Sequence, residues 1–310
     1  MVPFFSARHV EAAVPPERAY EAVRTAFVAH ARGEWTMQPK LYVTNYPAGD
    51  FRAMPALGGG HALLKWVTSF PGNPALGLPT VSGVVILSNA DTGVVEAVMD
   101  AGSVTALRTG AAAALGAETL GRPGVSAAVI GAGVNGRAAA RSLKALGRDV
   151  ALWDVDGERA HSVAAGLGVG VAASREEALA ADIVVTVTPG KQILLPEGSL
   201  RPGQHVSLMG ADGPGKAEIA VAEIRRASIY CDEWEQASHG GELAAAVEAG
   251  AITRDDVTEL GAVLTGEAEG RRSTDEITIF DSTGLAIQDL AIAIAAFERA
   301  GELDLPRLEL

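Results

Sequence analysis

A strand, a glycine-rich turn and a helix follow one another in VSAAVIGAGVNGRAAARSLKALG, residues 125–147. Gly131, Gly133 and Gly136 have the spacing G-x-G-x-x-G. In this motif the first glycine makes the tight turn, the second lets a pyrophosphate approach the backbone, and the third lets the helix pack on the strand. The pyrophosphate rests on free N–H groups at the helix start. The segment therefore predicts a Rossmann-type dinucleotide site, although an ordinary strand–turn–helix connection has the same pattern.

An acidic residue ends the next apolar segment. Asp154 follows DVALW and lies 23 residues after Gly131, close to the roughly 20 expected for the acid that binds the adenosine ribose. A carboxylate here repels a 2′-phosphate, so NAD is favoured over NADP as the cofactor. Asp156 is an alternative for the same role, and Arg159 is a signal against the NAD preference.

The chain changes character on either side of the GRPG break at 121–124. Between residues 40 and 100, short apolar segments separated by Gly, Pro, Asn and Asp predict a β-rich unit with an antiparallel or mixed sheet. After the break, strand and helix patterns alternate, as in a parallel, doubly wound sheet. Residues 284–300 predict a buried closing helix that returns to the first part. We therefore expect an α/β protein with one domain of residues 1–118 and 285–310 and a Rossmann domain of residues 119–284.

Composition excludes several function classes. The chain has 25 basic and 38 acidic residues, a formal net charge of −13, which argues against nucleic acid or an anionic membrane as a partner. No apolar run reaches the ~20 residues that cross a bilayer, and the N-terminal segment lacks the pattern of a secretory signal. Cys231 is the only cysteine, so we expect a cytoplasmic location. No metal-ligand spacing occurs, and no metal is expected.

Two cationic residues are candidates for a site. Lys65 lies in HALLKWVTSF with Leu63 and Val67 on its own face of a strand. Burial among apolar side chains lowers a lysine pKa towards values useful for proton transfer, whereas the common alternative is an edge-strand lysine that reaches water. Arg108 lies in an Ala-rich helix with no other charge nearby, so we expect it to point into a site and bind a carboxylate with its planar fork.

Asp212 is the single acid in the loop GADGPGK, which follows the apolar strand HVSLM. Ligands bind beyond the carboxyl ends of parallel strands, so Asp212 is a candidate catalytic residue. An Asx turn that shapes the loop explains the same residue. The sequence alone leaves these two interpretations open.

Six segments, DFRAMPA, LLKWVTSFPGNP, LRTGAAAALGAETL, GADGPGK, EQASHGGE and FDSTGLAIQD, together resemble the ornithine cyclodeaminase/mu-crystallin family, and most of all its archaeal alanine dehydrogenase branch. The resemblance covers nearly the whole chain. It implies a homodimer whose first domain carries the substrate ligands and dimer contacts and is completed by the C-terminal helix. It also implies hydride transfer between the α-carbon of an amino acid and NAD.

The resemblance also implies roles for individual residues. Lys65 and Asp212 are the catalytic residues and act as a coupled pair, and Lys40, Arg52, Lys65 and Arg108 bind the substrate. His239 and Glu242 are interpreted as helix-surface residues. Adding the glycine motif and the residues expected beside the phosphates and the nicotinamide, the predicted cofactor contacts are Thr109, Gly110, Gly131, Gly133, Val134, Asn135, Asp154, Thr188, Gly210, Ala211, Ser282, Thr283 and Gly284.

The function that these observations favour is NAD-dependent oxidation of L-alanine to pyruvate and ammonia, and its reverse. In ornithine-cyclising relatives the position of Arg52 resembles a glutamate. A cation there, with only the α-carboxylate to bind, favours a small neutral amino acid. The alternatives are an ornithine cyclodeaminase that recycles NAD, a cyclic ketimine reductase, and a non-catalytic NAD(P)H-dependent binding protein of the mu-crystallin type.

Overall fold

The computed structural model describes residues 1–190, 192–213 and 215–309. The chain divides into two compact units, Met1–Arg108 with Leu285–Leu310, and Thr109–Gly284. The division falls inside the helix α3 (Ala101–Leu120). The expected boundary between residues 118 and 119 lies within the last turn of this helix, because the break in the sequence pattern comes directly after the helix, at residues 121–124. The helix itself is continuous across the division.

The first unit is built on a mixed sheet with the strand order β16-β1-β7-β6-β5-β4-β2, and β3 pairs with β4. β1 is parallel to β7, whereas β4, β5 and β6 are antiparallel neighbours, so the expected mixed sheet is confirmed. The strands are β1 (Val2–Phe5), β2 (Thr36–Met37), β3 (Leu41–Asn45), β4 (Gly49–Gly58), β5 (His61–Ser69), β6 (Val81–Asn89), β7 (Val95–Asp100) and β16 (Arg307–Leu308).

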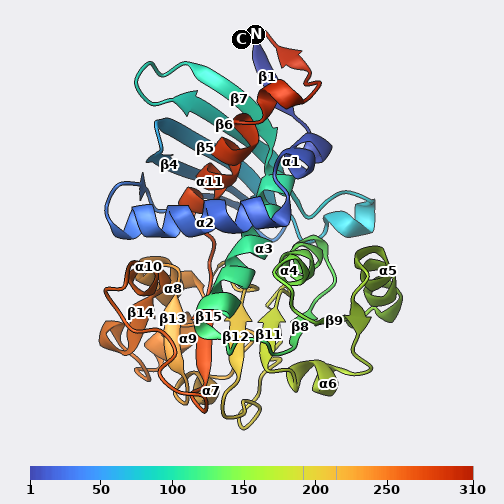
Figure 1. Ribbon diagram of the computed structural model, residues 1–310, viewed down its shortest axis with the longest axis vertical. Helices are drawn as coiled ribbons and strands as arrows, with labels where there is room; N and C mark the ends of the chain where they lie inside the picture. Colours follow the sequence, from blue (N-terminus) through green and yellow to red (C-terminus); the bar gives the residue numbers. More distant parts are fainter. Residues whose placement is uncertain (191, 214, 310) are drawn as a thin grey trace. The chain divides into compact units, whose positions relative to one another are not determined.

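Helices cover one face of this sheet. They are α1 (Ala7–Ala13), α2 (Pro16–Ala31) and α11 (Ala286–Phe297). The unit also contains the short turns η1 (Asn73–Leu76) and η3 (Ala300–Glu302). α11 packs against β4, β5 and α2 (Figure 1), and most of its side chains are buried. The apolar C-terminal segment is thus the central helix of the first unit, as expected. The sequence patterns did not predict β1 and α1, since each is too short to show a period.

The second unit contains a parallel sheet with the order β10-β9-β8-β11-β12-β15-β13-β14, and each of these described pairs is parallel. The predicted Rossmann-type, doubly wound sheet is confirmed. The chain leaves β8 towards β9 on one side and later returns to β11 on the other, so the topological switch point lies at β8. The strands are β8 (Ala127–Ile130), β9 (Val150–Trp153), β10 (Gly170–Val171), β11 (Ile183–Thr186), β12 (His205–Leu208), β13 (Ser228–Cys231), β14 (Val257–Glu259) and β15 (Thr278–Asp281).

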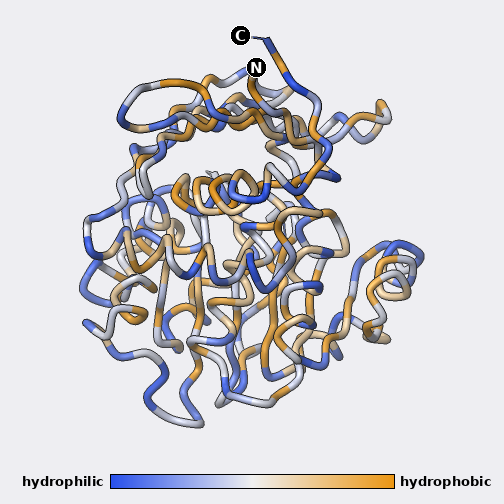
Figure 2. Tube along the Cα trace, turned by 45° about the horizontal axis from the view of Figure 1, so that its top comes forward, coloured by the Kyte–Doolittle hydropathy of each residue, from blue (hydrophilic) through white to orange (hydrophobic). Residues whose placement is uncertain are grey.

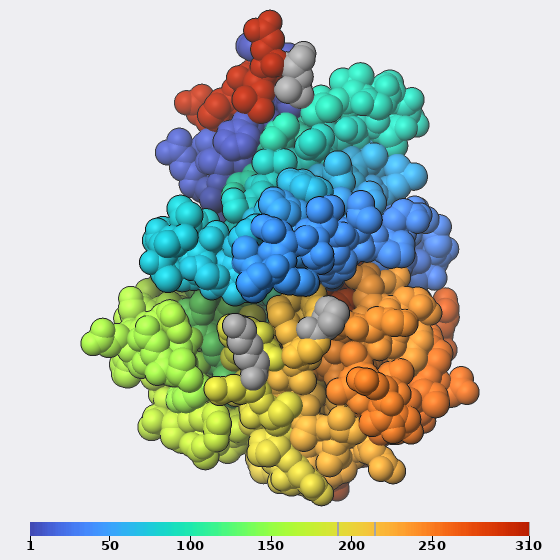
Figure 3. Space-filling view, turned by 180° about the vertical axis from the view of Figure 1, so that it is seen from behind, coloured from blue at the N-terminus to red at the C-terminus, as the bar shows by residue number. Residues whose placement is uncertain are grey.

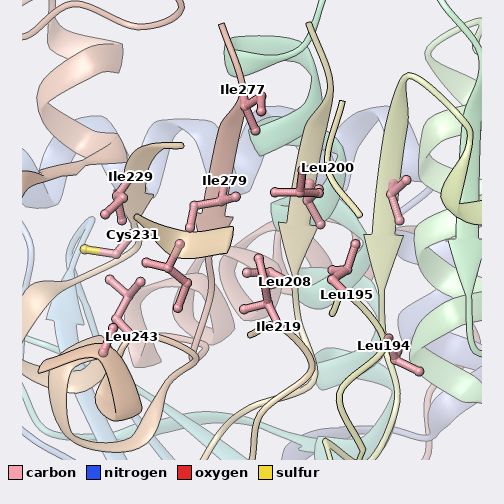
Figure 4. Close-up of a cluster of buried hydrophobic side chains, with 14 of the residues drawn as sticks. Leu194, Leu195, Leu200, Leu208, Ile219, Ile229, Cys231, Leu243, Ile277 and Ile279 are labelled. Carbon is pink, nitrogen blue, oxygen red and sulfur yellow. The ribbon is translucent and has the colours of Figure 1, made fainter. Parts of the chain in front are cut away.

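The helices of the second unit include α4, which follows β8 directly, and α5, which follows β9. The full set is α4 (Val134–Ala145), α5 (Gly157–Leu167), α6 (Arg175–Leu179), α7 (Val221–Ile224), α8 (Trp234–Gly240), α9 (Ala244–Glu248) and α10 (Leu260–Thr265), with the turn η2 (Arg254–Asp256). Hydrophobic colours follow the central strands, while hydrophilic colours gather in outer helices and loops (Figure 2). Leu208, Ile229 and Ile279 belong to a buried cluster on these strands (Figure 4), which fixes the strand ends where ligands of such folds bind.

Candidate active site and cofactor site

Lys65 is buried in the interior of the first sheet. Its strand, β5, pairs with β4 on one side and β6 on the other, so the edge-strand alternative is wrong. The side chain is 1% exposed, and its Nζ donates to Oδ1 of Asp289 at 2.8 Å. Burial lowers the pKa of Lys65 from 10.5 to about 8, with Asp289 opposing the shift and Arg108 and Arg52 adding to it. A lysine in this state exchanges protons near neutral pH, as the sequence predicts.

Asp289, on α11, completes a group that the sequence analysis did not identify. Its side chain is fully buried, and Nε of Arg108 lies 3.6 Å from the same Oδ1 that binds Lys65. Among the described residues, Oδ2 of Asp289 and Nε of Arg108 have no hydrogen-bond partner. A buried acceptor and a buried donor that lack partners in the protein are available to a ligand. A signal existed, because Asp289 is an acid in an otherwise apolar helix, the same pattern that identified Arg108.

Arg52 has a protein partner that the sequence argument overlooked. Its Nε donates to Oδ1 of Asp50 at 2.6 Å, and both side chains are nearly buried. The guanidinium also lies over the ring of Tyr42, 5.3 Å from its centroid. The expectation that Arg52 has only a substrate carboxylate to bind is therefore wrong. Asp50 and Arg52 lie two residues apart on one strand and therefore on the same face of the sheet. The spacing in the sequence could have predicted this ion pair. Lys40 is partly exposed just before β3.

Asp212 lies in the loop after β12, in the second unit, and about a third of its side chain is exposed. It forms an ion pair with Lys216, four residues later. Lys65 and Asp212 therefore each have an ionic partner within their own unit, Asp289 and Lys216. The structure thus pairs Lys65 with Asp289, and the expected coupling of Lys65 with Asp212 stays a prediction.

The glycine-rich turn has the conformation that a pyrophosphate site requires. Gly131 has φ +107°, and a Cβ there would lie 2.6 Å from the carbonyl oxygen of Val187. A Cβ on Gly136 would lie 1.7 Å from the carbonyl oxygen of Gly131. A Cβ on Gly133 would meet nothing within 4 Å. The first and third glycines are thus required by the fold, while the second faces open space before the start of α4, where a phosphate would approach.

Asp154 is buried at the end of β9 and accepts hydrogen bonds from two backbone N–H groups. Ala132, in the glycine turn, donates to Oδ2 at 2.6 Å, and Asp156 donates to Oδ1 at 2.9 Å. Arg159 adds an ion pair through Nη2 to Oδ1 at 2.6 Å. Burial alone would raise the pKa of Asp154, but the bonds from Arg159, Ala132 and Asp156 together hold it below its ordinary range. The carboxylate is therefore ionised and fixed beside the predicted pyrophosphate position.

Other predicted cofactor residues already have structural roles. A Cβ on Gly110 would lie 2.6 Å from backbone atoms of Ala138, so Gly110 allows α3 to pack closely on α4. Thr109 is buried beside it. Val134 is exposed at the start of α4, and Asn135 is partly exposed next to it.

The remaining predicted contacts lie at the carboxyl ends of β11, β12 and β15. Thr188 donates through its N–H and its hydroxyl to Glu218. A Cβ on Gly210 would lie 2.4 Å from an oxygen of Glu218, and Ala211 follows as a buried residue. Ser282, Thr283 and the N–H of Gly284 all donate to Asp232.

Four buried carboxyl groups support these strand ends, and the sequence analysis gave them no role. They are Glu218, Asp232, Glu242 and Asp281. Glu242 is 1% exposed and accepts from the N–H of Glu218 at 2.7 Å, so its interpretation as a surface residue is wrong, whereas His239 is exposed. Burial, reinforced by Glu218, raises the pKa of Glu242 to about 8. Burial also raises the pKa of Asp281 well above its ordinary value.

In the residues that the structure describes, no cluster of three or more His, Cys, Asp or Glu side chains is arranged to hold a metal ion. Within the same residues, no helix combines the length and apolarity that a membrane span requires.

Known proteins resemble this chain over almost its full length. The model of the ornithine cyclodeaminase/mu-crystallin family matches residues 3–303. The alanine dehydrogenase of Archaeoglobus fulgidus is 43% identical over 302 residues, 94% of this chain and 92% of that protein. The ornithine cyclodeaminase of Agrobacterium tumefaciens is 33% identical over 274 residues, 83% of this chain and 76% of that protein. The solved structure of an archaeal alanine dehydrogenase dimer with bound NAD superimposes with a TM-score of 0.92 at 40% identity, covering 97% of this chain and 96% of that one.

Proposed function

Because this chain belongs to the ornithine cyclodeaminase/mu-crystallin family, we propose that it is an NAD-dependent amino acid dehydrogenase. The proposed reaction is oxidation of L-alanine to pyruvate and ammonia, together with the reverse reductive amination. The observation that carries this proposal is the buried pair of Lys65 and Asp289 with Arg108 beside it. These residues place a proton acceptor next to cationic carboxylate ligands.

The charges of the first unit suit one substrate carboxylate. Lys65, Arg52 and Arg108 are three cations, and Asp50 and Asp289 are two anions. With Lys65 protonated, the balance is 3 − 2 = +1, which a single α-carboxylate neutralises. A second ammonium group on the substrate, as in ornithine, would leave an uncompensated positive charge in a desolvated site. The proposal of a small neutral amino acid therefore rests on the net charge of the group, since Asp50 already neutralises Arg52.

The proton chemistry follows from the same residues. The α-ammonium group of alanine must lose a proton before its α-carbon can be oxidised. Lys65, with a pKa near 8, is available in its neutral form to take that proton. Oδ2 of Asp289, which has no partner among the described residues, is a suitable acceptor for an N–H of the substrate amine. We assign Asp212, which forms an ion pair with Lys216, to the water that attacks the oxidised substrate.

NAD, when bound, supplies the hydride acceptor of this reaction. The residues proposed to hold it are the glycine turn at 131–136 and Asp154. This proposal is supported by the open space at Gly133, the backbone geometry of Gly131 and the ionised state of Asp154. The other predicted contacts, including Thr188, remain proposals for the phosphates and the nicotinamide end.

A second copy of this chain is the proposed partner. The outer face of β3, β5 and β6 exposes Leu41, Val43, Leu64, Trp66 and Val84, and the strand register places Trp66 beside Val84. Residues of β3 and of the η1 region, blue to cyan in Figure 3, lie at the surface of the first unit. An apolar sheet face of this kind is typical of a subunit interface.

We also propose a cytoplasmic location, which suits a chain whose single cysteine, Cys231, is a buried free thiol.

The test is a substrate panel with the purified chain and NAD, measuring NADH absorbance and free ammonia together. Alanine should yield NADH and ammonia in equal amounts, and pyruvate with ammonia should consume NADH. An ornithine cyclodeaminase, the alternative favoured by the Agrobacterium relative, would release ammonia and proline from ornithine without net NADH. A cyclic ketimine reductase would consume NADH with a cyclic imine in the absence of ammonia. Efficient cyclisation of ornithine with no turnover of alanine or pyruvate would overturn the proposal.

A further inference from the structure

Asp154, the acid expected to bind the adenosine ribose, is already saturated with hydrogen bonds. Oδ1 accepts from the N–H of Asp156 at 2.9 Å and from Nη2 of Arg159 at 2.6 Å. Oδ2 accepts from the N–H of Ala132 at 2.6 Å and from Nε of Arg159 at 3.3 Å. A carboxylate offers about four lone-pair positions in all. A ribose hydroxyl therefore finds no free acceptor position while Arg159 stays in place.

The four donors differ in how easily they can leave. The N–H groups of Ala132 and Asp156 belong to the glycine turn and to the chain that follows β9, so they hold the carboxylate in place permanently. Arg159 lies in the first turn of α5, and 47% of its side chain is exposed. A guanidinium this exposed can exchange its carboxylate partner for water more easily than a buried backbone N–H can. Arg159 is thus the donor that a ribose can displace.

We propose that Arg159 sets the choice between NAD and NADP in this protein. In the free protein the guanidinium occupies the ribose-binding oxygens of Asp154, and the ribose hydroxyls of NAD replace it. The displaced cation remains tethered beside the ribose 2′ position, where an arginine can receive a 2′-phosphate. Arg159 therefore competes with NAD for Asp154 and offsets the repulsion between Asp154 and NADP. This inference rests on the proposed dinucleotide-dependent function.

The test measures dissociation constants for NADH and NADPH by fluorescence titration, without any substrate. Arg159→Gln should bind NADH about two- to fivefold more tightly, because no ion pair must be broken. It should bind NADPH about tenfold more weakly, because the carboxylate is then uncompensated. Arg159→Lys keeps the charge without the fork, so it should retain NADPH binding. The matched control is Arg175→Gln, which removes an arginine of similar exposure paired with Glu176 and should leave both constants unchanged.

The outcomes separate this inference from the function on which it rests. A wild-type chain that binds neither dinucleotide would overturn the proposed function and this inference with it. Suppose that the wild-type chain binds NADH and that the ratio of the NADPH to the NADH dissociation constant is the same in Arg159→Gln as in the wild type. That result would overturn the role of Arg159 alone. A ratio of the NADPH to the NADH dissociation constant that rises about 20- to 50-fold in Arg159→Gln, and less in Arg159→Lys, supports it.

Discussion

Replacing Asp289 with Asn should lower the pKa of Lys65, because the Asp289 carboxylate supports the charged form of this buried lysine, whereas burial, Arg108 and Arg52 oppose it. The two charged atoms lie 2.8 Å apart. At an effective dielectric constant of about 20, the Coulomb energy of such a pair is about 6 kcal/mol, which sets an upper limit of roughly four pKa units. Local relaxation reduces this, and buried lysines without a partner titrate at about 5–6. We therefore expect the pKa of Lys65 to fall from about 8 by roughly two units.

The titration can be read directly, because the chain has only five lysines. Selective ¹³C labelling of the lysine ε-carbons, with Lys65→Met to assign the missing signal, gives a titration curve for Lys65 in each variant. In parallel, the acidic limb of the pH profile of kcat/KM for alanine oxidation should move to lower pH by the same amount, since the neutral amine is the proposed base. Asp289→Glu keeps the charge and is the control for the change in polarity.

The same substitution has a pH-dependent cost in stability. A lysine whose pKa is lower in the folded than in the unfolded chain makes stability rise with pH between those two values. In Asp289→Asn the lower end of this pH range, which is the pKa of Lys65 in the folded chain, moves from about 8 to about 6. The extra loss of unfolding free energy, about 3 kcal/mol for two units, should be complete below about pH 6 and vanish as the pH rises through 8. A Lys65 signal that still titrates near 8 in Asp289→Asn would refute this account of the pair.

Three further predictions concern the other groups. Lys65→Met and Asp212→Asn should each lower kcat by at least the ~10²-fold typical of lost acid–base catalysis, with NAD affinity nearly unchanged; near-normal turnover in either would return that residue to a structural role. Glu242→Gln should flatten the pH dependence of stability: the wild type keeps a proton on this group up to about pH 8, so its unfolding free energy falls as pH rises from about 5 to 8, by at most ~1.4 kcal/mol per unit. The unfolding free energies can be measured by urea titration at several pH values. If they change with pH equally in Glu242→Gln and in the wild type, this prediction is contradicted. Gly136→Ala should destabilise the fold by about 1–3 kcal/mol, whereas Gly133→Ala should leave thermal stability intact and weaken NAD binding; equal melting temperatures for the two variants would contradict the assigned roles.

The elements of the fold were predictable where hydrophobic periodicity is strong. The alternation around Lys65 matches the observed burial of Leu63, Lys65 and Val67, and the apolar C-terminal segment forms α11 as expected. Hydrophobic periodicity predicts which face of a helix or strand is buried. It does not predict which other element packs against that face. The partner of Lys65 is 224 residues away in sequence, so only the docking of α11 on β5 brings Asp289 to it.

The buried acids of the second unit were unpredictable for a related reason. β15 lies between β12 and β13 in the sheet, and this order places Asp281 near Glu242, whose charge contributes to the raised pKa of Asp281. No local pattern in the sequence encodes that order. The pairing of Asp50 with Arg52 is different, because two residues on one strand face are neighbours whatever the topology, and a search for opposite charges at a spacing of two would have found it.

The formal charge of −13 also requires correction by the structure. That count treats every carboxyl group as ionised, yet burial raises the pKa of Glu242 to about 8, so at pH 7 this group is largely protonated. Burial also raises the pKa of Asp281 well above its ordinary value. With Lys65 protonated, the buried group around it carries an excess of one positive charge. An anionic amino acid carboxylate is thus attracted by a local field whose sign is opposite to that of the whole chain. The prediction from composition against large anionic partners therefore does not extend to a small anion that reaches Lys65 and Arg108.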